Sequence, residues 1–149
     1  VHTNDAIGAI TRMRDFKIEP FLLASTLRAV IAQRLVRRLC PDCREPVQAE
    51  AGAAALLGLD AGSVIHRPVG CDKCGHTGYQ GRIGVFEAIK VDDTVRRYIG
   101  NGGDEAIIAR HVFANSPNLA AAARRLVRDG ETTAEEAVRI MRSEATADA

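Results

Sequence analysis

The sequence predicts a mixed α/β protein in which a cysteine-containing, loop-rich insert interrupts helical segments. Apolar residues recur at spacings of three and four toward both ends of the chain, as in amphipathic helices. Between residues 40 and 84 this periodicity is lost, and eight of the thirteen glycines fall there, as expected for turns and short strands. All four cysteines lie in the same stretch, so we expect a bound metal to hold it together.

Composition limits the class of protein. The chain has 149 residues, enough for one domain or two small ones, and its 46% apolar content argues against disorder. Because 24 residues are alanine and none is tryptophan, we expect a thin core that depends on helices and an added staple. The formal net charge of +1 argues against a strongly basic nucleic-acid-binding face and against an acidic tail.

Secreted and membrane-spanning proteins are also disfavoured. Four cysteines are too few for a disulfide-dense domain, so the sequence does not indicate an oxidising compartment. The most apolar long stretch, Phe21 to Leu39, contains four arginines, which are costly inside a bilayer. The chain begins with Val1 and no Met, and we take it for a piece of a longer protein.

Helix signals appear in three segments of the first half. Asp5 is a predicted N-cap for a helix to Arg14. Pro20 suits a first helical turn, and leucines, valine and isoleucine at spacings of three and four predict that the strongest helix runs from there to Leu39. Ala49 to Leu57 is predicted to be helical, with Gly58 as its stop.

The second half is predicted to contain short strands followed by helices. Strands are expected at Ser63 to Val69 and Arg82 to Val91. Helices are then expected from Asp92 or Asp93 to Ile99, from Asp104 to Phe113, from Ser116-Pro117 to Arg128 with Gly130 past the end, and from the overlapping capping boxes of Thr132 with Glu135 and Thr133 with Glu136.

The cysteines carry the clearest chemical signal. Cys40-x-x-Cys43 and Cys71-x-x-Cys74 form two identical pairs that use every cysteine in the chain. Each two-residue gap lets one tight turn direct two sulfurs to a common ion, and two such turns supply the four-thiolate shell that Zn²⁺ accepts. The pattern predicts a structural zinc site with no open coordination position, while iron or another thiophilic metal and two independent redox dithiols stay open as alternatives.

Other residues near the cysteines are weaker candidates for a role at the metal site. His66 and His76 lie in the insert and can replace a sulfur ligand, but four cysteines make ordinary hydrogen-bonding roles the preferred interpretation. Four thiolates around Zn²⁺ carry a formal charge of −2, so neighbouring donors should matter. The cations close in sequence are Arg38, Arg44, Lys73 and Arg82.

Nucleotide-binding and hydrolase motifs do not occur in this sequence. It has no GxxxxGK[ST], GxGxxG, GxSxG or HExxH. The glycine-containing run from Gly75 to Arg82 can in principle cradle phosphate, but we interpret it as the turn by which the backbone leaves the second cysteine pair. The chain alone therefore shows no recognisable catalytic centre.

Four stretches resemble one known family, the ATPases of type II secretion and type IV pilus assembly. They are GCDKCGHTGYQGRIGVFE from Gly70 to Glu87, AQRLVRRLCPDC from Ala32 to Cys43, VHTNDA from Val1 to Ala6, and the closing element of Arg128-Asp129-Gly130 and Thr132 to Glu136. The likeness covers essentially the whole chain. The cysteine pairs in their Arg-Leu-Cys-Pro context resemble the E-protein branch of type II secretion more than the pilus retraction ATPases.

This resemblance implies a hexameric RecA-like motor in the cytoplasm, peripheral to the bacterial inner membrane, where ATP hydrolysis drives platform proteins and pseudopilus assembly. ATP and Mg²⁺ would bind the full-length protein, whose phosphate-binding loop would precede Val1. Of the active-site candidates only His2, from the family's His box, transfers to this chain. The resemblance also implies three segments: residues 1–39 as the end of the RecA-like domain, 40–85 as the tetracysteine zinc-binding subdomain, and 86–149 as a helical C-terminal subdomain.

A zinc-ribbon module that binds nucleic acid is the alternative from a different class. It would use the arginines of the segment before Cys40, namely Arg28, Arg34, Arg37 and Arg38. The simpler interpretation is that they form a solvated face. The near-neutral charge and the lack of aromatic residues among them count against nucleic acid, because proteins that bind single strands stack bases on aromatic rings.

Overall fold

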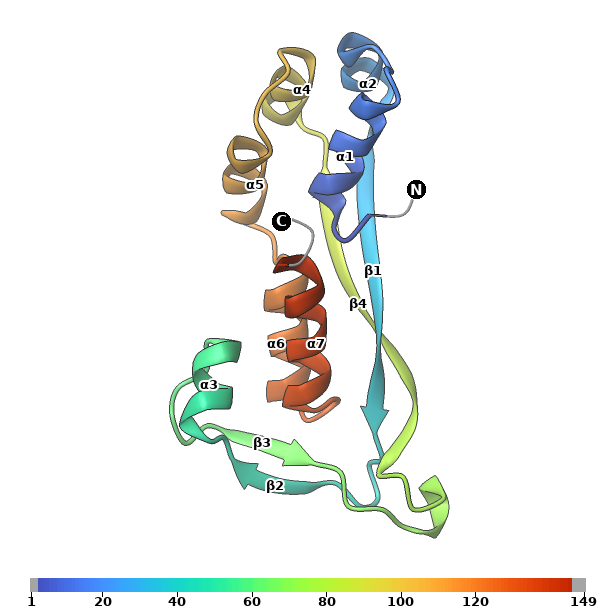
Figure 1. Cartoon of the computed structure of the whole chain (residues 1–149), viewed down its shortest axis with the longest axis vertical. Helices are drawn as coiled ribbons and strands as arrows, with labels where there is room; N and C mark the ends of the chain where they lie inside the picture. The colour runs from blue at the N-terminus through green and yellow to red at the C-terminus, as the bar shows by residue number, and fades with distance from the viewer. Residues whose placement is uncertain (1–2, 146–149) are drawn as a thin grey trace. The chain divides into compact units, whose positions relative to one another are not determined.

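The computed structural model describes residues 3–145, with side chains described through residue 142. It is a mixed α/β structure (Figure 1). Its elements are α1 (Ala6–Asp15), α2 (Pro20–Thr26), β1 (Ala29–Leu39), β2 (Glu45–Gln48), α3 (Ala51–Leu57), β3 (Val64–Arg67), a 3-10 turn η1 (Asp72–Cys74), β4 (Tyr79–Lys90), α4 (Asp93–Gly100), α5 (Glu105–Phe113), α6 (Leu119–Arg128) and α7 (Ala134–Ala145).

The chain divides into two compact units. Unit 1 comprises Val1–Gln33 and Phe86–Asn118, and unit 2 comprises Arg34–Val85 and Leu119–Ala149. The long strands β1 and β4 pair in a two-stranded sheet, and each strand contributes residues to both units. The three-segment division at residues 39 and 85 stays a prediction.

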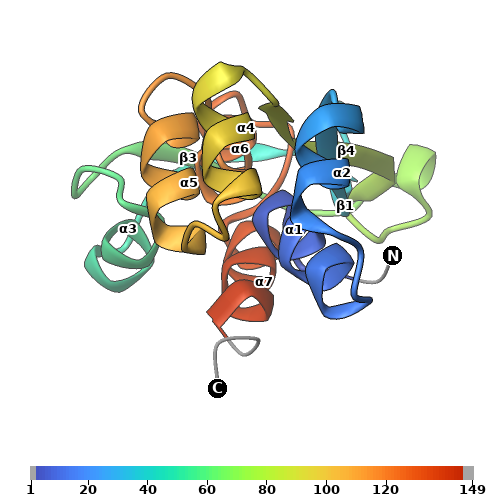
Figure 2. The same ribbon diagram turned by 90° about the horizontal axis from the view of Figure 1, so that it is seen from above.

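Unit 1 packs four short helices against the strand residues that it contains. Helix α2 packs on α4, and α5 packs on both α1 and α4; Figure 2 shows α4 beside α5. Ile10, Ile89, Ile99 and Ile108 are buried in a common core. The predicted caps are present: Asp5 accepts the Gly8 N–H, Asp92 the Val95 N–H and Asp104 the Ala106 N–H, at 2.6, 2.8 and 3.4 Å.

Unit 2 joins a small two-stranded antiparallel sheet to three helices. Strands β2 and β3 pair with Glu45 opposite Arg67 and Val47 opposite Ile65. Helices α6 and α7 pack together, α3 packs on α7, and α6 contacts β3. Leu57, Leu119 and Val127 fill the core and are fully buried.

The predicted helix from Pro20 to Leu39 is wrong beyond Thr26. Helix α2 ends there, Leu27 is extended with ψ of 125°, and β1 runs from Ala29 to Leu39. Val30 and Ala32 pack against the unit 1 core, whereas Ile31 between them is 67% exposed. Burial thus alternates with the period of a strand, and β-branched residues fit such a pleated surface. Spacings of three and four among the leucines concealed this alternation.

Strand β2 was also not predicted. It contains Pro46 opposite His66, and proline cannot donate to a ladder, so sequence patterns disfavour a strand there. In a two-stranded sheet each strand has one open edge, where the proline nitrogen needs no partner. The remaining expected elements are confirmed within a few residues, including the stop of α3 at Gly58, which is left-handed with φ of 64°.

Among residues 3–145, every helix is too short or too polar to span a bilayer.

A buried glutamate fastens α7 to β1 within unit 2. Glu136 is 4% exposed. Its carboxylate accepts hydrogen bonds from the backbone N–H and Nε of Arg37 at 2.8 and 3.0 Å, and from Nη2 of Arg139 at 2.9 Å. Burial acts to raise the pKa of Glu136, but these donors outweigh it, so the pKa lies below its ordinary value of 4.5.

The Glu136 contacts predict a pH-dependent contribution to stability. Glu136→Gln should lower the free energy of unfolding at pH 7 by roughly 1–3 kcal/mol, since hydrogen bonds to a charged group are lost. Because the folded pKa is depressed, this contribution is complete above pH 4.5 and disappears as the pH falls through the folded pKa. Urea unfolding at several pH values measures it. Glu135→Gln, on the exposed side of the same helical turn, is the control, and an equal loss in both variants would contradict the assignment.

Candidate metal centre

The first cysteine pair lies at the end of β1. The Cys40 N–H donates to the Gly78 carbonyl at 3.0 Å, and the Arg44 N–H donates to the Cys40 carbonyl at 3.1 Å, which closes the turn between Cys40 and Cys43. Cys40 is fully buried. These backbone hydrogen bonds hold the turn that carries the first two sulfurs directly after β1.

The second pair brackets the 3-10 turn η1. Cys71 precedes the turn and Cys74 ends it, followed by Gly75 in the left-handed region at φ of 62°. The His76 N–H donates to the Cys71 carbonyl at 2.9 Å. The run that follows leads into β4 at Tyr79 and not into a helix, which agrees with its interpretation as a turn and not a phosphate cradle.

The four sulfur atoms form one compact cluster. All lie within 4.8 Å of one another. The Sγ to Sγ distances are 3.9 Å for Cys40 to Cys71, 3.9 Å for Cys43 to Cys74 and 3.8 Å for Cys71 to Cys74. Disulfide sulfurs would lie about 2.05 Å apart. Ligands at about 2.3 Å from a tetrahedral Zn²⁺ lie about 3.8 Å from each other, so the four cysteines can hold a metal ion of that kind.

Backbone N–H groups point at the sulfurs. The Gly70 N–H donates to Cys43 Sγ at 3.3 Å, and the N–H groups of Cys71 and Gly78 donate to Cys74 Sγ, each at 3.2 Å. Burial raises the pKa of Cys43 to about 11. Burial also acts to raise the pKa of Cys74, but the N–H groups of Cys71 and Gly78 outweigh it and lower the value to about 6.

Three of the four cationic neighbours expected from the sequence serve mainly other partners. Arg38 pairs with Glu131 at 2.7 Å, Arg44 donates to the Gly130 carbonyl, and Lys73 pairs with Asp42 at 2.6 Å. That carboxylate raises the pKa of Lys73, with smaller contributions from Cys71 and Cys40. The hydrogen bonds aimed at the sulfurs come from the backbone, which sequence reasoning did not predict.

Neither histidine of the insert belongs to the sulfur cluster within the described residues. His76 is exposed, and its Nε2 lies 3.0 Å from the Asp72 carboxylate. The Nδ1 atom of His66 is buried without a hydrogen-bond partner and faces Gly130, whose added Cβ would lie 2.8 Å from it. His2, the other predicted site residue, lies outside the described residues.

The turn between α6 and α7 docks on the strands that carry the cysteines. The Leu39 N–H donates to the Glu131 carbonyl at 2.8 Å, and Thr132 Oγ1 donates to the Arg37 carbonyl at 2.8 Å. Tyr79 contacts Thr133 through their hydroxyls at 3.3 Å. These contacts link the metal centre to the C-terminal helices of unit 2.

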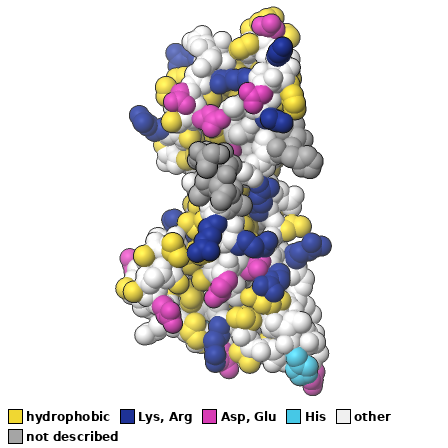
Figure 3. All heavy atoms as spheres, in the orientation of Figure 1, with side chains coloured by type: hydrophobic (Ala, Val, Ile, Leu, Met, Phe, Trp, Pro, Cys, Tyr) yellow, Lys and Arg dark blue, Asp and Glu magenta, His cyan; other side chains and the backbone are white. Residues whose placement is uncertain are grey.

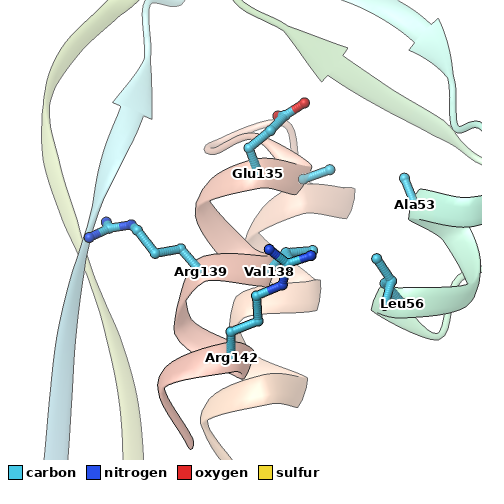
Figure 4. A pocket seen from close by; sticks show the side chains of 7 residues that line it. Ala53, Leu56, Glu135, Val138, Arg139 and Arg142 are labelled. Carbon is cyan, nitrogen blue, oxygen red and sulfur yellow. The ribbon is translucent and has the colours of Figure 1, made fainter. Parts of the chain in front are cut away.

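A separate hollow lies between α3 and α7 (Figure 4). Its volume is about 440 Å³, and Ala53, Leu56 and Val138 give it an apolar lining. Arg139 points away from α3 in this view and donates to Glu136. The hollow shares no residue with the sulfur cluster.

The sequence-family comparison gives these features a context. The model of the type II/IV secretion system protein family matches residues 1–139. The chain belongs to this family. The resemblance inferred from the sequence motifs is thereby confirmed.

Relatives in this family come from several bacteria. The chain is 47% identical over 146 residues to type II secretion system protein E of Pseudomonas aeruginosa, covering 97% of this chain and 29% of that protein. It is 46% identical to the protein of the same name from Aeromonas hydrophila, with the same coverage. It is 42% identical to type II secretion system ATPase E of Vibrio cholerae, over 94% of this chain and 28% of that one. The chain thus spans less than a third of these relatives.

The site geometry predicts that Gly78 is needed for order at the metal centre. At φ of 78°, its added Cβ would lie 2.4 Å from Pro68 Cβ, whereas Gly81 has a similar φ of 72° and no atom within 4 Å of its added Cβ. Gly81→Ala therefore reports backbone strain alone, about 1 kcal/mol. Gly78→Ala should lower the free energy of unfolding by roughly a further 1–3 kcal/mol, as overpacking does. It should also weaken Co²⁺ binding, which is measured by the thiolate absorption bands of the bound ion. Equal stability and equal Co²⁺ affinity of the two variants would contradict this role.

Proposed function

We propose that this chain is the C-terminal part of the cytoplasmic ATPase that powers pseudopilus assembly and protein export in type II secretion. The observation that carries the proposal is the compact cluster of four cysteine sulfurs in a chain of the type II/IV secretion family. A relative sharing 42% of its residues is named as an ATPase of that system. In this proposal the complete protein is a homo-hexamer that acts on inner-membrane platform proteins.

The metal in this proposal is one structural Zn²⁺ held by Cys40, Cys43, Cys71 and Cys74. Four sulfurs complete a tetrahedral shell, so a substrate or water is not required at the ion. The ion would compensate four thiolates that repel one another, and it would order turns that have little apolar packing of their own. Metal binding then supplies folding free energy for this part of the chain.

Nucleotide chemistry belongs to the complete protein in this proposal. The present sequence has no GxxxxGK[ST], so the chain alone should not cradle the phosphates of ATP and should be inactive. Residues 1–39 would complete the RecA-like domain, with 40–85 and 86–149 as the zinc-binding and C-terminal helical subdomains. His2 would stand near the phosphates of ATP and Mg²⁺, where a polar or charged side chain can act on developing negative charge.

The arginines of β1 fit this proposal better than a nucleic-acid interface. Arg37 and Arg38 are paired with Glu136 and Glu131, and Arg37 also lies over the Tyr79 ring at 4.0 Å from its centroid. On the face drawn in Figure 3, basic side chains lie among acidic ones. Such charges are largely compensated within the protein, which does not favour phosphate backbones.

The first prediction of this proposal is one Zn²⁺ per chain after purification without added zinc. Elemental analysis measures the ratio, and a thiol reagent should titrate the cysteines only after chelation. Chelation should also remove a large share of stability, since structural zinc contributes on the order of 10 kcal/mol in small metal modules. A ratio near zero with four freely reacting thiols in the folded protein would overturn the zinc assignment.

The second prediction separates His2 from the cysteines in the complete protein. His2→Ala should lower ATP turnover by about 10²-fold, as removal of a transition-state contact does, with zinc content and hexamer fraction unchanged. Cys71→Ser should instead lose zinc and local order, and any loss of turnover should follow the loss of hexamer. Turnover, zinc and hexamer content are measured on both variants. Parental turnover in His2→Ala would remove His2 from the site, and full zinc retention in Cys71→Ser would remove that ligand.

A further inference from the structure

Unit 1 contains a buried carboxylate that the metal centre does not use. Glu87 lies in β4 and is 2% exposed. It follows the inward alternation of the strand, two residues before Ile89 and four before Val91, which are both buried. A carboxylate in such a position is costly unless its oxygens accept hydrogen bonds.

A partner of Glu87 is the start of α1. Its Oε1 accepts the N–H of Ala6 at 3.0 Å, across 81 residues of sequence, and Ala6 is fully buried. Ala6 is the first residue of α1, so its N–H is one of those that the helix itself leaves unpaired. The negative charge of a carboxylate is also favoured at a helix N-terminus.

Local contacts shape the backbone just before α1. Thr3 Oγ1 donates to the Asp5 carbonyl at 3.1 Å, and the Asp5 carboxylate accepts the Gly8 N–H at 2.6 Å. A Cβ at Gly8 would lie 3.1 Å from that carboxylate, so glycine leaves room for the close approach. These contacts set the form of the turn, while the Glu87 contact joins the turn to β4.

The opposite end of α1 is anchored as well. The guanidinium of Arg14 donates to the carbonyls of Gly103 and Ile99 at 2.8 and 3.3 Å, at the C-terminal end of α4. Helix α1 is thus held at its start by Glu87 and at its end by Arg14. The two anchors have different consequences, because only the start of the helix adjoins the segment of His2, Thr3 and Asn4.

We propose that Glu87 is a positioning residue: it fixes on β4 the start of α1, which the sequence places directly after the segment of His2, Thr3 and Asn4. The inference rests on the proposed role of His2 in ATP hydrolysis. Only three residues lie between His2 and Ala6 in the sequence, and four residue steps reach at most about 14 Å, so the anchored N–H is near in sequence to the residue proposed to act on ATP. A misplacement of about 1 Å can cost 10²-fold in rate.

The test compares Glu87→Ala, Glu87→Gln and Arg14→Met in the complete protein. Glu87→Ala should lower kcat by about ten-fold or more with KM changed less than about two-fold, because alignment and not nucleotide affinity is lost. Glu87→Gln keeps an acceptor oxygen for the Ala6 N–H and should recover most of the parental kcat. Arg14→Met should lower the melting temperature yet leave kcat per hexamer near the parental value.

Each outcome separates this inference from the function on which it rests. A complete parent protein that does not hydrolyse ATP contradicts the proposed function. An active parent with parental kcat in Glu87→Ala, or an equal loss of kcat per hexamer in Arg14→Met, overturns the positioning role of Glu87. If Glu87→Ala does not fold, Glu87→Asp takes its place: its shorter side chain should give a lower kcat than Glu87→Gln, and equal values overturn the inference.

Discussion

The convergence of four cysteine sulfurs on one point is the constraint on which, in the proposed function, unit 2 depends. The sulfurs lie within 4.8 Å of one another, and a thiolate among other thiolates is unfavourable without a cation between them. Burial disfavours the thiolate of Cys43 and raises its pKa to about 11, whereas backbone N–H donors favour the thiolate of Cys74 and lower its pKa to about 6. A tetrahedral Zn²⁺ removes that conflict and, in the proposed function, is the reason the turns can stay in place.

The turns also support structure beyond themselves. The end of β1 hydrogen-bonds to the α6–α7 turn through Leu39 and Arg37, and Glu136 in the first turn of α7 receives two donors from Arg37. Tyr79, the first residue of β4, reaches Thr133. A metal that fixes Cys40 and the start of β4 therefore helps to place the C-terminal helices of unit 2. In the proposed function, a structural metal would thereby have a physical route to influence the complete ATPase without contacting nucleotide.

The features that could be predicted from the sequence are those that a few neighbouring residues determine. Paired CxxC turns, the aspartate caps of α1, α4 and α5, and the glycine stop of α3 depend on a few neighbouring residues, so they could be identified without a structure. Strand β1 could not, because leucines there recur at helical spacing, while Val30 and Ala32 are partly buried against partners far along the chain. The N–H groups of Gly70 and Gly78 were missed because backbone direction carries no side-chain signal. Glu87 did leave a side-chain signal in the sequence, because it is an acidic residue at an inward position of a strand that was predicted.

Hydrogen exchange with and without bound metal tests the central claim most directly. The amides of residues 129–136, which span the α6–α7 turn and the start of α7, should lose protection together with those of the two cysteine turns when zinc is removed, because they depend on the same strand ends. Amides of α4, in unit 1, serve as the internal reference and should keep their protection. Unchanged protection across residues 129–136 in the zinc-free protein would contradict the account.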